Sequence, residues 1–378
     1  MRILISGGGT GGHIYPALAV ANELRERYNA ELLFIGDRNG LETTLVPAAG
    51  VPFAPISAGK LRRYLSRKAL GDLAKVPVGM VEALQHARKF RPHAAFTSGG
   101  YVSVPAGFAA RLIGAPLLMH QQDVPPNLAN RLLTPIATRI SVSFAASERY
   151  FPRNRVALLG NPARAEILAA AKLDGPAERA RFGLDPALPV ILVTGGSQGA
   201  RHVNQVVADA LPALLPHYQV LHVSGEGTYE ETRTRAETAL ASAPDAAALR
   251  PRYALFPYLK TEMPQAIAAS DVVICRSGAS TLTELALIGR ASLLVPLPPG
   301  FGGSPQAINA AMFQKAGAAD VILDKEMTPD EISERLRALL DNPGKRQSMA
   351  AAAQTFALPN AARDLADAVA ELARRAST

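Results

Sequence analysis

A glycine-rich turn of one design occurs twice in this chain. Residues 3–16 read Ile-Leu-Ile-Ser-Gly-Gly-Gly-Thr-Gly-Gly-His-Ile-Tyr-Pro, and residues 190–201 read Val-Ile-Leu-Val-Thr-Gly-Gly-Ser-Gln-Gly-Ala-Arg. In both, a short apolar run leads through glycines into helix-like spacing. A strand delivers the chain in this way to a helix N-terminus, where free backbone N–H groups can hold an anion. Two copies nearly half the chain apart predict two nucleotide-fold domains that face each other across a cleft.

Strand-like and helix-like segments alternate along the rest of the chain. The strand-like runs are 2–6, 31–36, 93–97, 116–120, 138–143, 189–194, 219–224, 252–256, 271–275 and 291–296. Helical spacing covers 16–28, 78–90, 200–215, 281–289, 304–316 and 329–341. Strands separated by helices of this length predict right-handed βαβ units and parallel sheets. The fold class is therefore α/β, with two Rossmann-like parallel-sheet domains.

The domain boundaries are predicted from breaks in the alternation of strands and helices. Gly160-Asn161-Pro162 interrupts the pattern and is interpreted as an interdomain hinge. This predicts an N-terminal domain over 1–160 and a C-terminal domain over 161–350. The Ala-rich stretch 350–376 predicts one or two final helices, and we expect the segment 351–378 to return to the N-terminal domain.

Composition restricts the class of protein. A length of 378 residues favours two domains, and 48% apolar with 19% charged residues indicates a soluble α/β protein. Cys275 is the only cysteine, which excludes disulfides within the chain and fits a reducing compartment. The first apolar run is too short for a signal peptide and is better interpreted as a strand. No segment reaches the roughly 18–20 apolar residues of a membrane span.

Positive charge is concentrated in the first half. Residues 1–159 hold 19 Lys and Arg against 9 Asp and Glu, whereas the remainder holds 21 against 23. The densest part interleaves basic residues with Leu61, Tyr64, Leu65 and Leu70; the basic residues are Lys60, Arg62, Arg63, Arg67, Lys68 and Lys75. This pattern suits an anionic membrane surface, and an ordinary solvated helix face is the alternative. Nucleic acid is not expected as a partner, because no binding motif is present, aromatics are few and Trp is absent.

The first glycine turn differs from a dinucleotide fingerprint. Gly7-x-Gly9-x-x-Gly12 matches that fingerprint by letter, but the acidic residue expected about 20 positions later is displaced, with Asp37 lying beyond Gly36. His13 follows the glycines at or near the helix start, where the positive helix end disfavours imidazolium. The sequence therefore predicts a neutral His13 that accepts a proton, and a capping or packing histidine is the alternative.

A third segment has the character of a phosphate site. Residues 276–284 read Arg-Ser-Gly-Ala-Ser-Thr-Leu-Thr-Glu, follow a predicted strand and open a helix. Small residues there suit a phosphate held on backbone N–H groups, with the hydroxyls of Ser280 and Thr281 adding bonds. Glu284 has two interpretations: a ligand for sugar hydroxyls, or the partner of Thr281 in a capping box.

Together these motifs form a set in a fixed order. The set is Gly8-Gly9-Thr10-Gly11-Gly12-His13, Ser98-Gly99-Gly100-Tyr101, Gly160-Asn161-Pro162-x-Arg164, Gly195-Gly196-Ser197-Gln198-Gly199-Ala200 and Cys275-Arg276-Ser277-Gly278-Ala279. Over about residues 3–320 it resembles the MurG family, the bacterial glycosyltransferases of peptidoglycan synthesis that add N-acetylglucosamine to lipid I. The resemblance implies the two-domain glycosyltransferase B fold, with UDP-N-acetylglucosamine bound by the C-terminal domain. It also implies a peripheral protein on the cytoplasmic face of the cell membrane.

The resemblance assigns roles to matching residues. Ala279, Ser280, Thr281, Leu282, Thr283 and Glu284 resemble the segment that holds the nucleotide, with Glu284 on the ribose. Ser197 resembles the serine on the diphosphate, Arg164 the arginine that contacts the donor, and Gln306 the glutamine on the sugar. Leu259 lies where the family offers its backbone to the uracil, although the loop 256–263 is one residue longer here. Thr10, Gly11 and Gly12 resemble the turn that closes over the donor sugar.

One motif departs from the family pattern. Where the family usually has His-Glu-Gln-Asn, this chain has His120-Gln121-Gln122-Asp123. Gln121 cannot act as a general base, whereas Asp123 can accept hydrogen bonds from a sugar hydroxyl or take over acid/base work. The stretch 298–303 also lacks the charged residues that many relatives carry.

We therefore expect an inverting transfer from UDP-N-acetylglucosamine to lipid I, the undecaprenyl-pyrophosphoryl-N-acetylmuramoyl-pentapeptide acceptor. His13 is the expected base and Asp123 the second candidate. No cofactor is expected to be required, and no cluster with metal-ligand spacing is present in the sequence. Three alternatives stay open: another lipid-directed glycosyltransferase of the same fold, a UDP-N-acetylglucosamine 2-epimerase, and a non-catalytic nucleotide-sugar binder.

Overall fold

The computed structural model describes residues 1–59, 67–196, 199–298 and 306–376, which form two compact units. Unit 1 comprises Met1–Arg164 and Leu358–Thr378, and unit 2 comprises Ala165–Ala357. The boundaries expected from the sequence were 160 and 350, so each lies within seven residues of a change of unit.

Unit 1 is built on a seven-stranded parallel sheet with the strand order β3-β2-β1-β4-β5-β6-β7. The strands are β1 Arg2–Ser6, β2 Glu31–Asp37, β3 Phe53–Ile56, β4 Ala94–Thr97, β5 Leu117–Gln121, β6 Arg139–Val142 and β7 Val156–Leu158. Its helices are α1 Gly11–Tyr28, α2 Glu42–Ala48, α3 Arg67–Phe90, α4 Ser103–Leu112, α5 Leu128–Leu133 and α16 Ala361–Arg375, with a short 3₁₀ turn η1 at Ala145–Tyr150. The central strands β1, β4 and β5 are buried almost throughout because helices cover both faces of the sheet.

Unit 2 repeats the design on a six-stranded parallel sheet with the order β10-β9-β8-β11-β12-β13. The strands are β8 Val190–Thr194, β9 Gln219–Val223, β10 Tyr253–Phe256, β11 Val272–Cys275, β12 Ala291–Leu294 and β13 Asp320–Val321. The helices are α6 Ala165–Ala170, α7 Gly175–Arg179, α8 Arg201–Leu214, α9 Tyr229–Ala241, α10 Ala246–Leu249, α11 Met263–Ala269, α12 Ala279–Ile288, α13 Gln306–Lys315, α14 Pro329–Leu340 and α15 Pro343–Gln354. Short 3₁₀ turns are η2 Ala180–Phe182, η3 Glu226–Thr228, η4 Arg250–Arg252 and η5 Asp324–Glu326.

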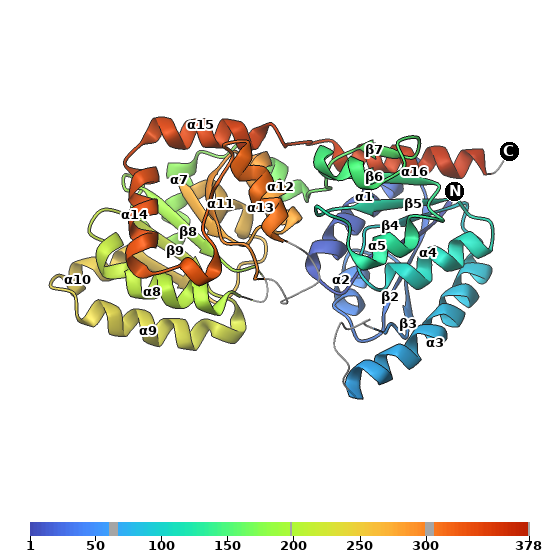
Figure 1. Ribbon diagram of the computed structural model, residues 1–378, viewed down its shortest axis with the longest axis horizontal. Helices are drawn as coiled ribbons and strands as arrows, with labels where there is room; N and C mark the ends of the chain where they lie inside the picture. The colour runs from blue at the N-terminus through green and yellow to red at the C-terminus, as the bar shows by residue number, and fades with distance from the viewer. Residues whose placement is uncertain (60–66, 197–198, 299–305, 377–378) are drawn as a thin grey trace. The chain divides into compact units, whose positions relative to one another are not determined.

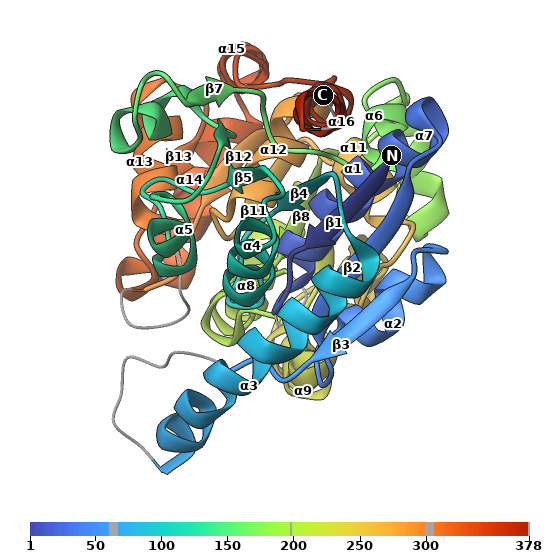
Figure 2. The same ribbon diagram turned by 90° about the vertical axis from the view of Figure 1, so that its right-hand side faces the viewer.

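The C-terminal helix α16 is part of the core of unit 1. It lies beside α1 (Figures 1 and 2), and its buried Leu365 and Val369 join a cluster with Ile5 and Ile14. The chain therefore closes unit 1 with its last segment after completing unit 2. On the other face of the sheet, α3 and α4 pack side by side. Within the described residues, no helix combines the length and apolar character of a membrane-spanning segment.

Helix starts differ most from the sequence prediction. Helix α1 begins at Gly11 instead of residue 16, and α12 begins at Ala279 instead of residue 281. Gly and Ser are weak helix formers, so the pattern excluded them. The first helical turn donates no intrahelical N–H bonds, and residues of low propensity are therefore tolerated there.

Both sheets bring two glycine turns together at one edge. Strand β1 lies next to β4, and β8 lies next to β11, with Ser6 paired to Thr97 and Thr194 paired to Cys275. In each sheet the strand order reverses at this pair, which is the switch point where ligands bind outside the carboxyl ends of parallel strands. The glycine turns after all four strands therefore lie at the predicted binding edges of the two units.

Candidate active site

The two glycine turns of unit 1, 7–12 and 98–101, are in direct backbone contact. The Gly8 N–H donates to the carbonyl oxygen of Gly99 at 3.3 Å. A Cβ on Gly100 would lie only 2.1 Å from the Gly8 oxygen, and Gly100 also has a φ of +85°. A side chain at residue 100 is therefore excluded both by space and by backbone conformation.

His13, on the first turn of α1, is held by the second of these turns. Its Nδ1 lies 3.1 Å from the carbonyl oxygen of Ser98, and the Ser98 hydroxyl donates to the His13 carbonyl oxygen at 2.6 Å. Because a carbonyl oxygen only accepts, Nδ1 carries the proton in the neutral ring and Nε2 is the acceptor. Burial lowers the pKa of His13, against the charge of Asp123 and the Ser98 hydrogen bond, which raise it. The imidazole is therefore suited to accept a proton at neutral pH.

Asp123 lies two residues beyond β5 and is only 8% exposed, yet its charge acts on His13. Next to it, Gln122 donates through Nε2 to the same Ser98 oxygen that His13 contacts, at 3.2 Å. The segment 120–123 and His13 thus meet at one backbone carbonyl of the turn 98–101. The structure brings together the two residues that the sequence nominated for acid/base work.

Both the oxygen and the nitrogen of the Gln121 amide form hydrogen bonds inside the protein. The residue is fully buried, its Oε1 accepts from Asn130 Nδ2 at 2.7 Å, and its Nε2 donates to the Asp123 carbonyl oxygen at 2.7 Å. A carboxylate could not make that donation. Gln121 therefore fixes the backbone of Asp123.

His120 is a structural histidine. Its ring nitrogens contact Ser141 Oγ at 2.9 Å and Asn161 Oδ1 at 3.2 Å, and burial lowers its pKa to about 4. Asn161, from the segment interpreted as a hinge, is thereby tied to the end of β5 within unit 1.

The remaining predicted residues of unit 1 surround the start of α1. Thr10 is its extended N-cap, and its carbonyl oxygen accepts from the N–H groups of His13 and Ile14. Gly11 and Gly12 are the first two helical residues. Arg164 places its guanidinium 5.1 Å from the ring centroid of Tyr15, one turn into the same helix. Arg164 belongs to unit 1, so the structure groups it with His13.

In unit 2, the glycine turn after β8 rests on a buried polar network. Gly196 and Gly199 have φ of +77° and +72°, and a Cβ on Gly199 would lie 2.4 Å from the Ser224 oxygen. Asn204 on α8 donates through Nδ2 to that oxygen at 2.8 Å, and its Oδ1 accepts from His222 Nε2 at 3.1 Å. The other ring nitrogen of His222 contacts the Tyr253 hydroxyl at 3.0 Å. The network joins the turn to β9 and β10.

The predicted nucleotide segment forms the start of α12. Gly278 is the N-cap, so Thr281 lies inside the first turn and the capping-box interpretation of Thr281 and Glu284 is wrong. Ser280, Thr281 and Glu284 are half-buried on one face, whereas Ala279, Leu282 and Thr283 are buried. The polar face and the helix N-terminus thus occur together, as an anionic ligand requires.

Gln306, the first residue of α13, lies over that N-cap. A Cβ on Gly278 would be 3.6 Å from Gln306 Nε2, while Gln306 Oε1 accepts from the Leu297 N–H at 3.1 Å. Ser277 Oγ donates to the Gln306 carbonyl oxygen at 2.9 Å. The structure therefore brings Gln306 to the segment Ala279–Glu284.

An ionic link holds the same edge of unit 2. Arg276 pairs with Asp324 at 2.6 Å, donates to the Val295 carbonyl oxygen at 3.2 Å, and Asp324 also contacts His202 Nδ1 at 2.8 Å. Asp324 lies on η5, after β13, far along the chain from both partners. No sequence signal distinguished it from other surface acids.

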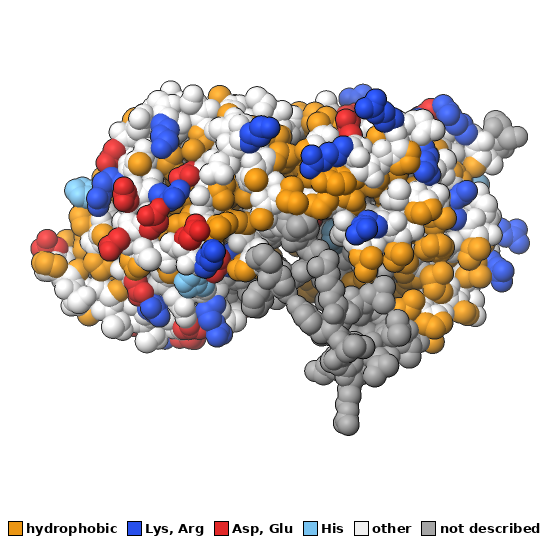
Figure 3. All heavy atoms as spheres, viewed as in Figure 1, with side chains coloured by type: hydrophobic (Ala, Val, Ile, Leu, Met, Phe, Trp, Pro, Cys, Tyr) orange, Lys and Arg blue, Asp and Glu red, His pale blue; other side chains and the backbone are white. Residues whose placement is uncertain are grey.

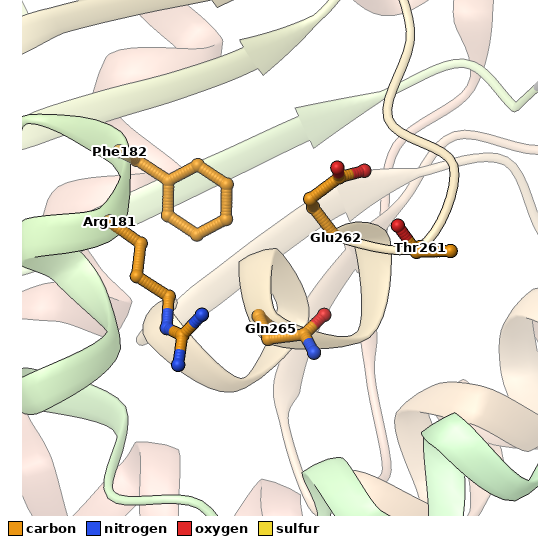
Figure 4. Close-up of a pocket in the computed structure, with 5 residues that line it drawn as sticks. All are labelled: Arg181, Phe182, Thr261, Glu262 and Gln265. Carbon is orange, nitrogen blue, oxygen red and sulfur yellow. The ribbon is translucent and has the colours of Figure 1, made fainter.

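Leu259 is buried in the loop between β10 and α11. The residues that follow it line a cavity of about 460 Å³, in which side chains from η2 face those at the start of α11 (Figure 4). The lining residues are Arg181, Phe182, Thr261, Glu262 and Gln265. None of the predicted site residues is among them.

Some predicted residues cannot be placed. Ser197, the stretch 299–303 and Lys60, Arg62 and Arg63 lie outside the described residues, as do the side chains of Arg67, Lys68 and Lys75. Among the residues that are described, no group of three His, Cys, Asp or Glu side chains is arranged to hold a metal ion.

Comparison with known proteins gives consistent similarities along the chain. Residues 3–142 match the glycosyltransferase family 28 N-terminal domain, and residues 190–365 match the family 28 C-terminal domain. The UDP-N-acetylglucosamine--N-acetylmuramyl-(pentapeptide) pyrophosphoryl-undecaprenol N-acetylglucosamine transferase of Desulforudis audaxviator is 37% identical, with 99% of each chain covered. Acinetobacter baumannii MurG has a TM-score of 0.75 at 28% identity, covering 98% of this chain and 99% of that one. Neisseria meningitidis UDP-GlcNAc 2-epimerase, at 13% identity, TM-score 0.68 and coverage of 98% and 100%, shows the shared fold alone.

The buried His222 predicts an acid-sensitive unit 2. Burial lowers its pKa to about 3 in the folded chain, against about 6.5 when unfolded. Below pH 6.5, His222 therefore binds a proton in the unfolded state but not in the folded state. The free energy of unfolding decreases as the pH falls from 6.5 towards 3. Between pH 7.5 and 5.5 the wild type should lose about 1.4 kcal/mol more unfolding free energy than His222→Gln in urea titrations. The exposed His217→Gln variant is the matched control, and equal pH dependence in wild type and His222→Gln would contradict the assignment.

Proposed function

The chain belongs to glycosyltransferase family 28 and, within it, to the MurG enzymes, and we propose that it transfers N-acetylglucosamine from UDP-N-acetylglucosamine to lipid I. The observation that carries this proposal is the 37% identity to a transferase of that name over 99% of both chains. The reaction product is lipid II, the precursor used in peptidoglycan synthesis. The fold is the glycosyltransferase B fold, with one parallel-sheet domain in each unit.

In the proposed reaction, the 4-hydroxyl oxygen of the N-acetylmuramoyl acceptor attacks the anomeric carbon of the donor sugar. The new C–O bond forms as the bond from that carbon to the diphosphate oxygen breaks, UDP leaves with the bonding electrons, and the configuration inverts. His13 Nε2 takes the hydroxyl proton. The hydrogen bond from Nδ1 to the Ser98 carbonyl oxygen supports this role, because it leaves Nε2 unprotonated on the side of the ring away from the turn 98–101.

Asp123 is proposed to act together with His13. Its charge raises the proton affinity of the imidazole while burial lowers it. A carboxylate at this position also accepts hydrogen bonds from sugar hydroxyls. Asp123 is in addition the alternative base.

The donor is proposed to bind at unit 2. The N-terminus of α12 offers N–H groups and positive potential to the diphosphate, with Ser280 and Thr281 adding hydroxyls and Glu284 accepting from the ribose. Gln306 contacts the sugar, Leu259 offers its backbone to the uracil, and Ser197 contacts the diphosphate. Thr10, Gly11, Gly12 and Arg164 contact the donor from unit 1. Charge on the leaving UDP is thus stabilised by fixed dipoles, and we propose that no metal or other cofactor is required.

The transfer reaction is tested by incubating the purified chain with labelled UDP-N-acetylglucosamine, with and without lipid I. We expect labelled lipid II only when lipid I is present, and an unchanged rate in excess chelator. A labelled epimer formed without an acceptor would instead support the 2-epimerase, and transfer to diacylglycerol would support another lipid-directed transferase. UDP-N-acetylglucosamine binding with no turnover on any acceptor would support the non-catalytic binder.

Replacing the proposed base should separate chemistry from binding. His13→Ala removes the proton acceptor, so kcat should fall by roughly 10²- to 10⁴-fold, the usual contribution of general base catalysis. Calorimetric affinity for UDP should change less than twofold, because the donor residues of unit 2 are untouched. Asp123→Asn, which keeps the size but removes the charge, should lower kcat less than His13→Ala does. Full activity of His13→Ala, or a larger loss of kcat in Asp123→Asn, would show that His13 is not the main proton acceptor.

A face of unit 1 supports peripheral membrane binding. Exposed apolar side chains gather over α3, α4 and α5 (Figure 3), with Leu112 67% and Val81 56% exposed. Val78, Leu128 and Leu132 complete this apolar face. Exposed apolar side chains near basic ones suit insertion at an anionic lipid surface, and the basic cluster of residues 60–75 precedes or begins α3. We propose that this face docks on the cytoplasmic side of the cell membrane, where lipid I is reached.

The apolar face is tested with vesicles. Leu112→Ser with Leu128→Ser should reduce co-sedimentation with phosphatidylglycerol vesicles severalfold, since apolar area that would enter the lipid is lost. Arg62→Ser, Arg63→Ser, Arg67→Ser and Lys68→Ser together should weaken binding to these vesicles and leave binding to phosphatidylcholine vesicles unchanged. Leu323→Ser, an equally conservative change at a 40% exposed leucine of unit 2, is the control. Unchanged sedimentation of both multiple variants would refute the proposed docking face.

A further inference from the structure

We propose that Glu42 is a positioning residue for the first glycine turn, and that through this turn it sets the place of His13. The inference rests on the transfer reaction proposed above and names a residue that the sequence motifs did not include. Glu42 is the first residue of α2 and is fully buried. A fully buried carboxyl side chain is rare unless polar groups surround it, so its contacts indicate its purpose.

One of these contacts is with the turn itself. Glu42 Oε1 accepts the backbone N–H of Gly9 at 2.9 Å. Gly9 has a φ of +87°, a left-handed backbone conformation that glycine adopts without strain. In a glycine turn before a helix, such an N–H is the group that would otherwise bind a ligand anion. Here the chain supplies the oxygen from its own side chain.

Glycines make room for this carboxyl group from two sides. A Cβ on Gly8 would lie 1.6 Å from Glu42 Oε1, and a Cβ on Gly40 would lie 1.9 Å from Oε2. At Gly36 a Cβ would lie 3.0 Å from Glu42 Cβ. Neither Gly8 nor Gly40 has a positive φ, and the three atoms nearest to each Cβ position belong to Glu42. These two positions are therefore reserved for the Glu42 carboxyl group.

The position of Gly9 in turn affects the position of His13. On its other side Gly9 meets Tyr101, whose ring would lie 2.7 Å from a Cβ on Gly9 and whose hydroxyl donates to Asp37 Oδ2 at 2.6 Å. Gly9 is thus held between Glu42 and Tyr101, directly before the N-cap Thr10. Tyr101 belongs to the turn 98–101, whose Ser98 oxygen orients the imidazole. A displaced Gly9 would disturb both the helix start and the partner of His13 Nδ1.

The test measures turnover and donor affinity for Glu42 variants of the full chain. Glu42→Ala removes the acceptor, and kcat should fall at least tenfold while KM for UDP-N-acetylglucosamine and calorimetric affinity for UDP change less than twofold. Glu42→Gln keeps an oxygen for the Gly9 N–H, and it should restore kcat to within about threefold of wild type. Glu42→Asp, one methylene shorter, should resemble Glu42→Ala.

A double-mutant cycle tests whether the effect passes through the carboxyl group. Gly40→Ala lies outside the catalytic turn, yet it should lower kcat because its Cβ displaces the Glu42 side chain. In the Glu42→Ala background the same change should cost less than twofold, since the atoms it would strike are gone. Gly227→Ala is the matched control, because its Cβ would meet nothing within 4 Å and its φ is not positive. Multiplicative losses in Gly40→Ala/Glu42→Ala would overturn the proposal.

A readout that does not need turnover separates this inference from the proposed reaction. The imidazole proton resonance of His13, identified by its loss in His13→Ala, should shift in Glu42→Ala and Gly40→Ala but not in Glu42→Gln. A lowered melting temperature in Glu42→Ala with an unmoved resonance and unchanged kcat would reduce Glu42 to a structural residue. A wild type that does not form lipid II, with the resonance shifts as stated, would count against the reaction and leave the positioning role standing.

Discussion

The backbone contact between the glycine turns after β1 and β4 determines what unit 1 can do. The Gly8 N–H bonds to Gly99, and the Gly100 Cα approaches the Gly8 carbonyl so closely that no side chain fits. Neighbouring parallel strands bring the two turns to one edge, but only glycine lets them touch. The contact places the Ser98 carbonyl beside the first turn of α1, and this carbonyl fixes the tautomer of His13. Without the contact, the helix would still form, but its histidine would have no defined acceptor nitrogen.

The two strand-turn-helix units use the same geometry for different purposes. In unit 1 the Gly9 N–H is occupied by Glu42, so the turn carries an internal acceptor and presents a base. In unit 2 the hydrogen-bonded network of Asn204, Ser224 and His222 packs against the glycine turn. No carboxylate contacts the described part of this turn. A turn that already holds a side-chain oxygen is poorly suited to a diphosphate, whereas one supported by neutral groups keeps its positive potential. This physical difference supports the proposal that the base belongs to unit 1 and that the anion binds to unit 2.

The sequence predicted the features that depend on neighbouring residues better than those that depend on contacts between distant residues. Strand runs, glycine turns and the position of His13 depend on neighbouring residues, and the parallel sheets follow from the spacing of the elements. The predicted start of α12 was two residues late, in part because Ser280 has low helix propensity, and the capping box was lost with it. Glu42 and Asp324 act on residues that are distant in the chain, so no pattern around either one announces its role.

The exchange at residues 121 and 123 is best understood as the displacement of a carboxylate. Where the family usually has Glu and then Asn, this chain has Gln121 and then Asp123, so the number of carboxylates in the segment is conserved. Gln121 uses its amide to donate to the Asp123 carbonyl oxygen, which a glutamate could not do, and so it anchors the backbone that carries the relocated acid. The relocated charge raises the pKa of His13 while burial lowers it, and burial prevails. The imidazole of His13 therefore stays uncharged, which is the state in which it can accept a proton, and the position of Asp123 allows it to stabilise the imidazolium that results.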